Sequence, residues 1–247
     1  MKKNKIKKIW QEGGVAINGW LSIPSSVSAE FMTHEGWDSL TIDMQHGLND
    51  YSSTVSMLQV ISSTETIPFV RIPWNDPEII MKMLNVNTYG IICPMINSQQ
   101  ECENFVNACR YSYLGYRNIT SNNEVITMAM IETKKGVENL DSILSVNGLD
   151  SIYIGPADLS FSYIQKPDFD ILDPPVFQVI ESIVKKAKDK NIYAGIHVGS
   201  TDYAHKMIEL GFQFISILSE IKIMSNATQE ILREMKKNKF KKNFSTY

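Results

Sequence analysis

The feature that most constrains the fold of this chain is a regular alternation of short β-rich segments with amphipathic helical segments, repeated along the whole sequence. Eight segments have the composition and bounding residues of strands. They span residues 15–23, 39–43, 68–73, 90–96, 125–132, 151–155, 193–199 and 214–219. Eight successive βα units favour a closed (β/α)8 barrel over a doubly wound sheet, so we predict a TIM barrel of the α/β class.

Capping residues and glycines indicate where the intervening helices begin and end. Ser25 and Asp76 precede two of them, Gly36 follows the first of these, and Gly211 follows another. No segment has the composition of a linker, and a barrel of this type commonly needs about 250 residues. We therefore expect residues 1–247 to form one barrel domain, with its active site at the carboxyl ends of the strands.

Charge and hydropathy exclude several classes of protein. The formal net charge of −3 gives no overall attraction for nucleic acid. No apolar run approaches the roughly 18 residues of a membrane span. Lysines are concentrated at both ends of the sequence, at about 1–8 and 236–247. They could form a nucleic-acid-binding patch, but we favour frayed, solvated ends. Three cysteines without a CxxC pair indicate neither a disulfide framework nor a zinc site, and we expect a cytoplasmic protein.

Polar residues stand where predicted strands two and three end. Asp43 precedes His46 by three residues, so its carboxylate could orient the imidazole for proton transfer near neutral pH. A turn-capping aspartate beside an exposed histidine explains the same spacing. Arg71 lies within an apolar run, which is costly unless the guanidinium meets an anion. It therefore points either to a polar cavity or to a structural ion pair.

Strands five and six also end in carboxylates. Glu132 and Asp158 on adjacent strand ends could share a hard divalent cation and leave positions open for a bidentate substrate. Each could instead cap a helix, a role that suits Asp158 in particular. The turn at Gly155 and Pro156 exposes backbone N–H groups that suit an anion. The coincidence of such residues at four strand ends predicts a functional site.

With these residues in view, the sequence resembles the HpcH/HpaI aldolase and citrate lyase beta-subunit family, whose members include class II pyruvate aldolases such as 4-hydroxy-2-oxoheptanedioate aldolase. The resemblance runs from about Gly19 to about Leu218. It rests on residues 19–21, 25–26, 29–30, 42–46, 70–77, 94–95, 110–111, 115–117, 131–133 and 155–160, of which the last group is the most specific.

The resemblance implies a barrel of the phosphoenolpyruvate/pyruvate-binding type and a carbon-carbon lyase that acts on a 4-hydroxy-2-oxo acid, or on pyruvate and an aldehyde. It implies that Glu132 and Asp158 bind Mg2+, Mn2+ or Co2+. Arg71 would lie beside the keto oxygen, where a fixed positive charge stabilises a developing enolate. His46, held by Asp43, would move protons.

The resemblance also implies a substrate pocket and an assembly. The pocket would include Trp20, Gly155, Pro156 and Ala157. The protein would be a homo-oligomer in which the final helix packs on a neighbouring subunit. Its partners would be a small 2-oxo acid and an aldehyde, with no nucleic acid and no membrane.

Three departures from the family pattern keep other functions open. Gln45 replaces an acid before the histidine, Asn85 replaces a common aspartate, and residues 118–130 replace a longer segment that shapes the mouth or the oligomer. The alternatives are an acyl-coenzyme A lyase of the citrate lyase beta type and a catalytically degenerate barrel that binds a ligand. The retained pair Glu132 and Asp158 argues against the degenerate barrel, because a buried carboxylate pair without a cation is costly.

Overall fold

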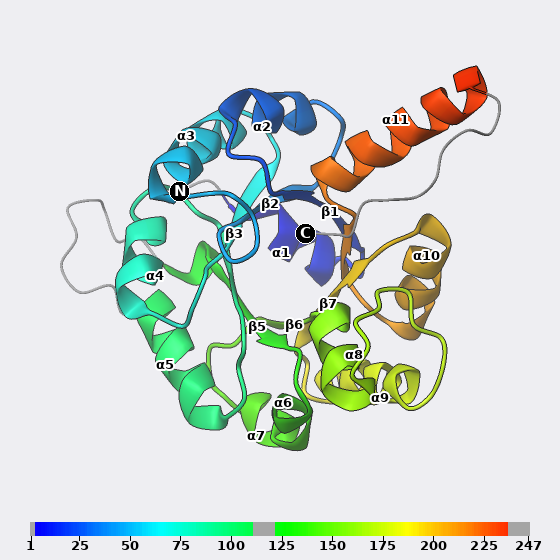
Figure 1. Ribbon diagram of the computed structural model, residues 1–247. Coiled ribbons are helices and arrows are strands. Elements are labelled where there is room, and N and C mark those ends of the chain that lie inside the picture. The colour runs from blue at the N-terminus through cyan, green and yellow to red at the C-terminus, as the bar shows by residue number, and fades with distance from the viewer. Residues whose placement is uncertain (1–2, 111–121, 237–247) are drawn as a thin grey trace.

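A closed barrel of eight parallel strands, paired in sequence order from β1 to β8 and back to β1, forms the centre of the molecule. The computed structural model describes residues 3–110 and 122–236 (Figure 1). The strands are β1 Ala16–Leu21, β2 Ser39–Asp43, β3 Ile67–Arg71, β4 Gly90–Cys93, β5 Ile126–Ile131, β6 Ser151–Ile154, β7 Tyr193–Val198 and β8 Phe214–Ile217. The predicted (β/α)8 fold and all eight predicted strands are confirmed, with small differences at the strand ends.

Helices surround this barrel, as Figure 1 shows in a view from the carboxyl ends of the strands. They are α1 Lys5–Gln11, α2 Ser26–Thr33, α3 Tyr51–Ser62, α4 Pro77–Leu84, α5 Gln99–Arg110, α6 Lys134–Glu138, α7 Leu140–Ile143, α8 Pro156–Ile164, α9 Val176–Asp189, α10 Thr201–Leu210 and α11 Glu220–Lys236, with a 3-10 turn at Asn122–Glu124. None of the helices among the described residues is long and apolar enough to cross a membrane.

The period of two along each strand sorts the side chains into two cores. In β7, for example, Ile196 and Val198 face the helices, whereas His197 points into the barrel against Trp20. The barrel interior is packed by large side chains such as Phe69, Tyr153 and Phe214. Because these side chains fill the interior, a site can form only at the inward-facing positions nearest the carboxyl ends of the strands. Trp20, Asp43 and Arg71 occupy three of these positions.

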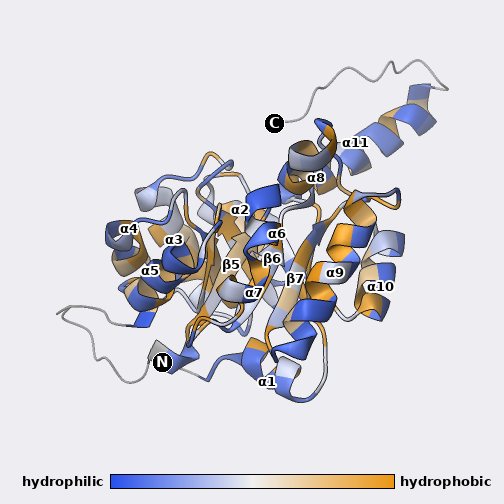
Figure 2. Cartoon of the chain, turned by 90° about the horizontal axis from the view of Figure 1, so that it is seen from below, coloured by the Kyte–Doolittle hydropathy of each residue, from blue (hydrophilic) through white to orange (hydrophobic). Residues whose placement is uncertain are grey.

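Helix α1 covers the opposite, amino-terminal end of the barrel, as Figure 2 shows. Ile6 and Trp10 are buried in the interior cluster, Trp10 stacks on Tyr193 at 4.4 Å, and its Nε1 donates to the carbonyl of Gln213 at 2.8 Å. The prediction that residues 1–8 are frayed is therefore wrong from residue 5 onward. Two apolar side chains at helical spacing bury the segment, while the lysines between them remain on the outer face.

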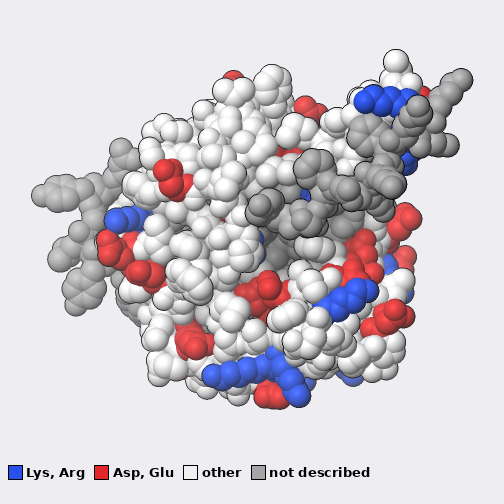
Figure 3. Space-filling view, viewed as in Figure 1, with Lys and Arg blue, Asp and Glu red and all other residues white. Residues whose placement is uncertain are grey.

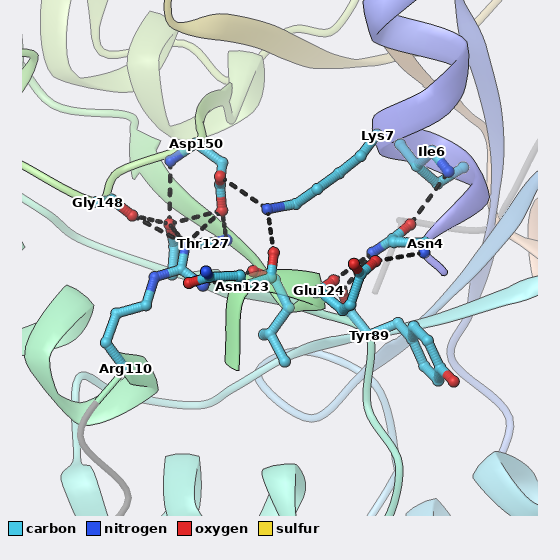
Figure 4. A network of polar contacts seen from close by, with 11 residues as sticks. Asn4, Ile6, Lys7, Tyr89, Arg110, Asn123, Glu124, Thr127, Gly148 and Asp150 are labelled. Carbon is cyan, nitrogen blue, oxygen red and sulfur yellow. Dashed lines mark hydrogen bonds and ion pairs between the residues drawn. The ribbon is translucent and has the colours of Figure 1, made fainter. Parts of the chain in front are cut away.

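A network of polar contacts ties α1 to this end of the barrel (Figure 4). The Asp150 carboxylate accepts hydrogen bonds from Arg110 Nη2 at 2.6 Å, from Lys7 Nζ at 3.0 Å and from the backbone N–H of Thr127 at 2.9 Å. Nearby, Asn4 caps α1 and donates to the carbonyl of Glu124 at 2.7 Å. These contacts lie at the end of the barrel away from the predicted site and serve the fold.

Helix α11 extends away from the barrel in both views (Figures 1 and 2). Its only buried side chain is that of Glu220, and apolar side chains along it are exposed, including Ile221, Met224, Ile231 and Met235. The helix ends at Lys236, the first residue of the segment predicted to be frayed. The rest of that segment, 237–247, lies outside the described residues. The first part of the shortened segment, 118–121, also lies outside them.

Candidate active site at the barrel mouth

A buried ion pair between Arg71 and Asp43 lies at the carboxyl ends of β3 and β2. Arg71 Nε donates to Asp43 Oδ1 at 2.9 Å and Nη2 donates to Asp43 Oδ2 at 2.6 Å, a bidentate arrangement. Burial opposes the charge on Asp43, but the guanidinium outweighs it and holds the carboxyl pKa below its usual value. Burial likewise opposes the charge on Arg71, but Asp43 keeps its pKa raised. Both groups are therefore charged.

The pair leaves part of the guanidinium available. Arg71 Nη1 makes no hydrogen bond within the described part of the chain, although the side chain is only 7% exposed. The Trp20 ring lies 4.9 Å from Arg71 Cζ, and its Nε1 donates to Asp43 Oδ2 at 3.2 Å. Asp43 and Trp20 thus fix a cation whose remaining donors can bind an anionic or carbonyl oxygen. Of the two sequence interpretations of Arg71, the structural ion pair is present.

Asp43 does not hold the His46 imidazole, as the sequence spacing suggested. Its Oδ1 accepts the backbone N–H groups of Gln45 at 3.0 Å and His46 at 3.2 Å, so it caps the turn in the way the alternative interpretation described. The His46 side chain is exposed and makes no hydrogen bond with any described residue. The physical reason is that the Asp43 oxygens are already taken: Oδ1 accepts from Arg71 and the two turn N–H groups, and Oδ2 accepts from Arg71 and Trp20.

The loop that carries His46 is nevertheless tightly held. A Cβ at Gly47 would lie 2.2 Å from the Asp43 carbonyl oxygen, so only glycine fits there. The buried Asn49 side chain donates to the carbonyl oxygens of Leu21 at 3.1 Å and Asp43 at 2.9 Å. These contacts join the ends of β1 and β2 and present His46 at the mouth.

Glu132 follows β5 and is almost completely buried, with 1% exposure. Its Oε1 accepts the backbone N–H of Met95 at 2.7 Å, while its Oε2 is buried without a hydrogen-bond partner among the described residues. Burial is the main cause that raises the Glu132 pKa, to about 7, and the Asp158 carboxylate adds to it. An unpartnered buried carboxylate oxygen beside a second carboxylate is the arrangement that a cation would satisfy.

Asp158 lies in the first turn of α8, close enough to Glu132 for its carboxylate to raise the Glu132 pKa, but it is exposed, so only one member of the carboxylate pair expected from the sequence is buried. A Cβ on Gly155, the residue before α8, would lie 2.7 Å from Glu132 Oε2, so the glycine keeps space open beside the unpartnered oxygen. No cluster of three or more His, Cys, Asp or Glu side chains able to hold a metal occurs within residues 3–110 and 122–236. The chemistry of the two carboxylates suits a hard divalent cation, and Glu132 and Asp158 are the residues that would hold one.

The remaining predicted residues surround this pair. Pro156 is buried at the start of α8 and Ala157 is partly exposed next to Asp158. Seen from the mouth, acidic side chains lie near the middle of the face as well as along its lower rim (Figure 3). Gln45 and Asn85, the two single-residue departures from the family pattern, lie in different places. Gln45 is in the His46 loop, and its buried Oε1 has no hydrogen-bond partner among the described residues, whereas Asn85 caps the end of α4.

Sequence reasoning missed His197. Its ring points into the barrel, 4.9 Å from the Trp20 ring centroid, and its Nδ1 lies 3.3 Å from the Tyr153 hydroxyl. Burial, with the nearby Arg71 charge, lowers the His197 pKa to about 4, so the ring is neutral near pH 7. The sequence signal for His197 was its place in the alternation of β7. It lies two residues after Gly195, and a Cβ added at Gly195 would meet the interior side chain of Tyr153, so both positions face the inside of the barrel.

A TIM barrel with a fixed cation and a carboxylate pair at its mouth defines a class of enzyme that stabilises negative charge on a small substrate. Comparison with known proteins identifies the family. Residues 18–227 match the model of the HpcH/HpaI aldolase/citrate lyase family, and the chain belongs to that family. It is therefore an aldolase, a carbon-carbon lyase, as the sequence resemblance predicted.

Individual relatives agree with this assignment. The chain is 32% identical over 246 residues to a hydroxypyruvate/pyruvate aldolase of Rhizorhabdus wittichii, covering 94% of this chain and 98% of that protein. It is 30% identical over 249 residues to a 4-hydroxy-2-oxo-heptane-1,7-dioate aldolase of Escherichia coli, covering 93% and 94%. An HpcH/HpaI aldolase/citrate lyase family protein from Burkholderia cenocepacia has a similar crystal structure, with a TM-score of 0.87, 25% identity and coverage of 95% and 100%.

Proposed function

We propose that this protein catalyses the divalent-metal-dependent aldol cleavage of a 4-hydroxy-2-oxo acid to pyruvate, or a related 2-oxo acid, and an aldehyde, together with the reverse condensation. The observation that carries the proposal is the unpartnered, buried Glu132 Oε2 beside Asp158, at the same mouth as the fixed Arg71 guanidinium. Mg2+, Mn2+ and Co2+ are the candidate ions for Glu132 and Asp158. When bound, such an ion supplies Lewis-acid polarisation of a keto oxygen.

Arg71 stabilises the charge that develops during cleavage. As the bond between C3 and C4 of the substrate breaks, its electron pair moves toward the keto group and negative charge grows on the C2 oxygen. The free Nη1 donor of Arg71 stabilises that oxygen, and the bidentate contact with Asp43 prevents the guanidinium from reorienting. Trp20 supports the same cation through its ring face and through the Asp43 carboxylate.

His46 moves the proton. Cleavage requires that the 4-hydroxyl group lose its proton as the aldehyde forms, and the resulting enolate must then be protonated at C3. The exposed imidazole of His46, held at the mouth by a backbone that Asp43 and Asn49 fix, is the group we assign to this transfer. Gly155, Pro156 and Ala157 form the adjoining wall of the pocket.

The two other functions that the sequence left open are less well supported. The two curated relatives described above, which align over more than 90% of the chain, carry aldolase names, and this favours aldol chemistry over an acyl-coenzyme A lyase. A degenerate binding barrel would leave the buried Glu132 carboxylate close to Asp158 without a cation to compensate it, which is costly.

We further propose a homo-oligomer and a cytoplasmic location. The exposed apolar side chains of α11 support packing of this helix on a neighbouring subunit. The three cysteines are free and buried, which suits a reducing compartment.

The proposed function is tested by the exchange of the pyruvate methyl protons with deuterium, followed by NMR, and by adduct formation with short aldehydes. Exchange is expected with Mg2+ or Mn2+, and it should fall by at least about 100-fold in Glu132→Gln and Asp158→Asn. Glu138→Gln, which alters an exposed carboxylate on α6, is the matched control and should exchange at the unaltered rate. Exchange that persists in chelator, or in both site variants, would overturn the proposal.

A further inference from the structure

The groups assigned to the 2-oxo acid occupy one part of the barrel mouth. Arg71 ends β3, Glu132 follows β5 and Asp158 follows β6. In the closed order of the barrel, β7, β8 and β1 form a continuous arc without a group assigned to the 2-oxo acid, and the His46 loop follows next, after β2; β4, which also lacks such a group, lies between β3 and β5. This arc is the part of the mouth left for an aldehyde that reacts with a 2-oxo acid bound to the first group.

Phe169 lies at the β7 side of this arc. It lies in the connection between α8 and α9, and its ring centroid is 5.7 Å from the His197 ring. His197 contacts Trp20 at 4.9 Å, and Trp20 lies 4.9 Å from Arg71 Cζ. A row of rings thus leads from the proposed pyruvate site to Phe169, whose side chain is 42% exposed.

The backbone on both sides of Phe169 is fixed by contacts with other elements. On one side, the Asp168 N–H donates to the buried Ser160 Oγ at 2.8 Å. On the other, Asp170 Oδ1 accepts the N–H of Gly199 at 2.7 Å, and the carbonyl of Ile171 accepts the Tyr203 hydroxyl at 2.7 Å. A half-exposed aromatic ring on a segment held by two backbone contacts and one side-chain contact is a preformed apolar surface, in contrast to a side chain on an unrestrained loop.

We propose that Phe169 is a specificity-determining residue, which forms the wall against which the carbon chain of the aldehyde packs and which favours aldehydes with an apolar or aromatic body. This inference rests on the proposed aldolase function and adds the chemical class of the acceptor. Phe169 contributes no charge and no proton, so it acts on the choice of aldehyde and leaves the activation of pyruvate unchanged.

The test compares Phe169→Ala with the unaltered protein in two assays. The first is metal-dependent exchange of pyruvate methyl protons without aldehyde, and the second is kcat/KM for benzaldehyde and for glycolaldehyde. We expect exchange within twofold of the unaltered rate and a fall of about tenfold or more in the ratio of the benzaldehyde to the glycolaldehyde constant, the size of effect that one apolar contact gives. Phe169→Leu, which keeps an apolar side chain, should restore most of the ratio.

Phe161→Ala is the matched control, because Phe161 is similarly exposed on α8, and it should leave both assays unchanged. An unchanged ratio in Phe169→Ala, or an equal change in Phe161→Ala, would overturn the inference while proton exchange upholds the aldolase function. Loss of exchange in Phe169→Ala, with a normal thermal unfolding midpoint, would also overturn it, because Phe169 would then act on pyruvate. Absence of exchange in the unaltered protein would overturn the proposed function, and the inference with it.

Discussion

Arg71 was predictable as a functional candidate because an arginine inside an apolar strand must meet an anion. The identity of that anion was not, since Asp43 had been paired with His46 on sequence spacing alone. Asp43 pairs with Arg71 because of the strand register: β2 and β3 are paired with Asp43 opposite Arg71, so the two side chains leave adjacent strands at the same level. His197 gave no signal beyond its place in the strand period, because its partners Trp20 and Tyr153 come from distant parts of the chain.

At this scale, Arg71→Lys is expected to lower the rate of pyruvate proton exchange by about 100-fold or more, because an ammonium cannot keep two bonds to Asp43 and donate to a substrate oxygen. Arg71→Ala should also destabilise the fold by about 3–5 kcal/mol, since the buried Asp43 carboxylate loses the cation that balances its charge. Exchange kinetics and urea unfolding measure the two effects. Full activity in Arg71→Lys would remove Arg71 from the mechanism.

His197 gives the pH dependence a predicted sign. Its pKa is about 4 in the folded protein, compared with 6.5 for an ordinary histidine. Between pH 6.5 and 4, the histidine is therefore protonated in the unfolded chain and neutral in the folded chain. The free energy of unfolding should therefore fall as the pH is lowered from about 6.5 to about 4. His197→Gln should reduce this slope, and His205→Gln, at an exposed position, should not. Equal slopes in the three proteins would contradict the assignment.

At the scale of elements, strand positions could be predicted because alternating apolar runs and glycine or proline breakers are local features. Helix α1 could not, because five lysines among the first eight residues mask the two apolar positions, Ile6 and Trp10, that bury it. Its burial depends on the far ends of the chain meeting at the base of the barrel, where Trp10 bonds to Gln213. A closed barrel supplies that contact, and no local pattern does.

The two ends of the barrel are expected to differ in what they contribute. Asp150→Ala, which removes the acceptor shared by Lys7, Arg110 and Thr127, should destabilise the fold by roughly 2 kcal/mol, while proton exchange per folded molecule stays unchanged. Asp141→Ala removes the exposed pair with Lys186 and should cost less than about 1 kcal/mol. Denaturant unfolding compares the two variants. A large loss of exchange in folded Asp150→Ala would contradict the separation.

For the whole molecule, the extended helix α11 predicts self-association. Four of its exposed apolar side chains, at positions 221, 224, 231 and 235, have the spacing of one helix face. The double variant Met224→Glu with Ile231→Glu should lower the mass in solution measured by light scattering. Asn226→Glu adds the same type of charge at an exposed position on another face and should not. A monomeric unaltered protein would contradict the proposed assembly.

The central claim for the molecule is that Glu132 and Asp158 bind the catalytic metal ion at the mouth of this barrel. The most direct measurement is anomalous diffraction from crystals grown with Mn2+ and pyruvate. We predict one strong manganese peak between the Glu132 and Asp158 carboxylates, with Arg71 beside the pyruvate keto oxygen. A fully formed mouth without manganese at these carboxylates, or with manganese bound elsewhere in the protein, would contradict the claim.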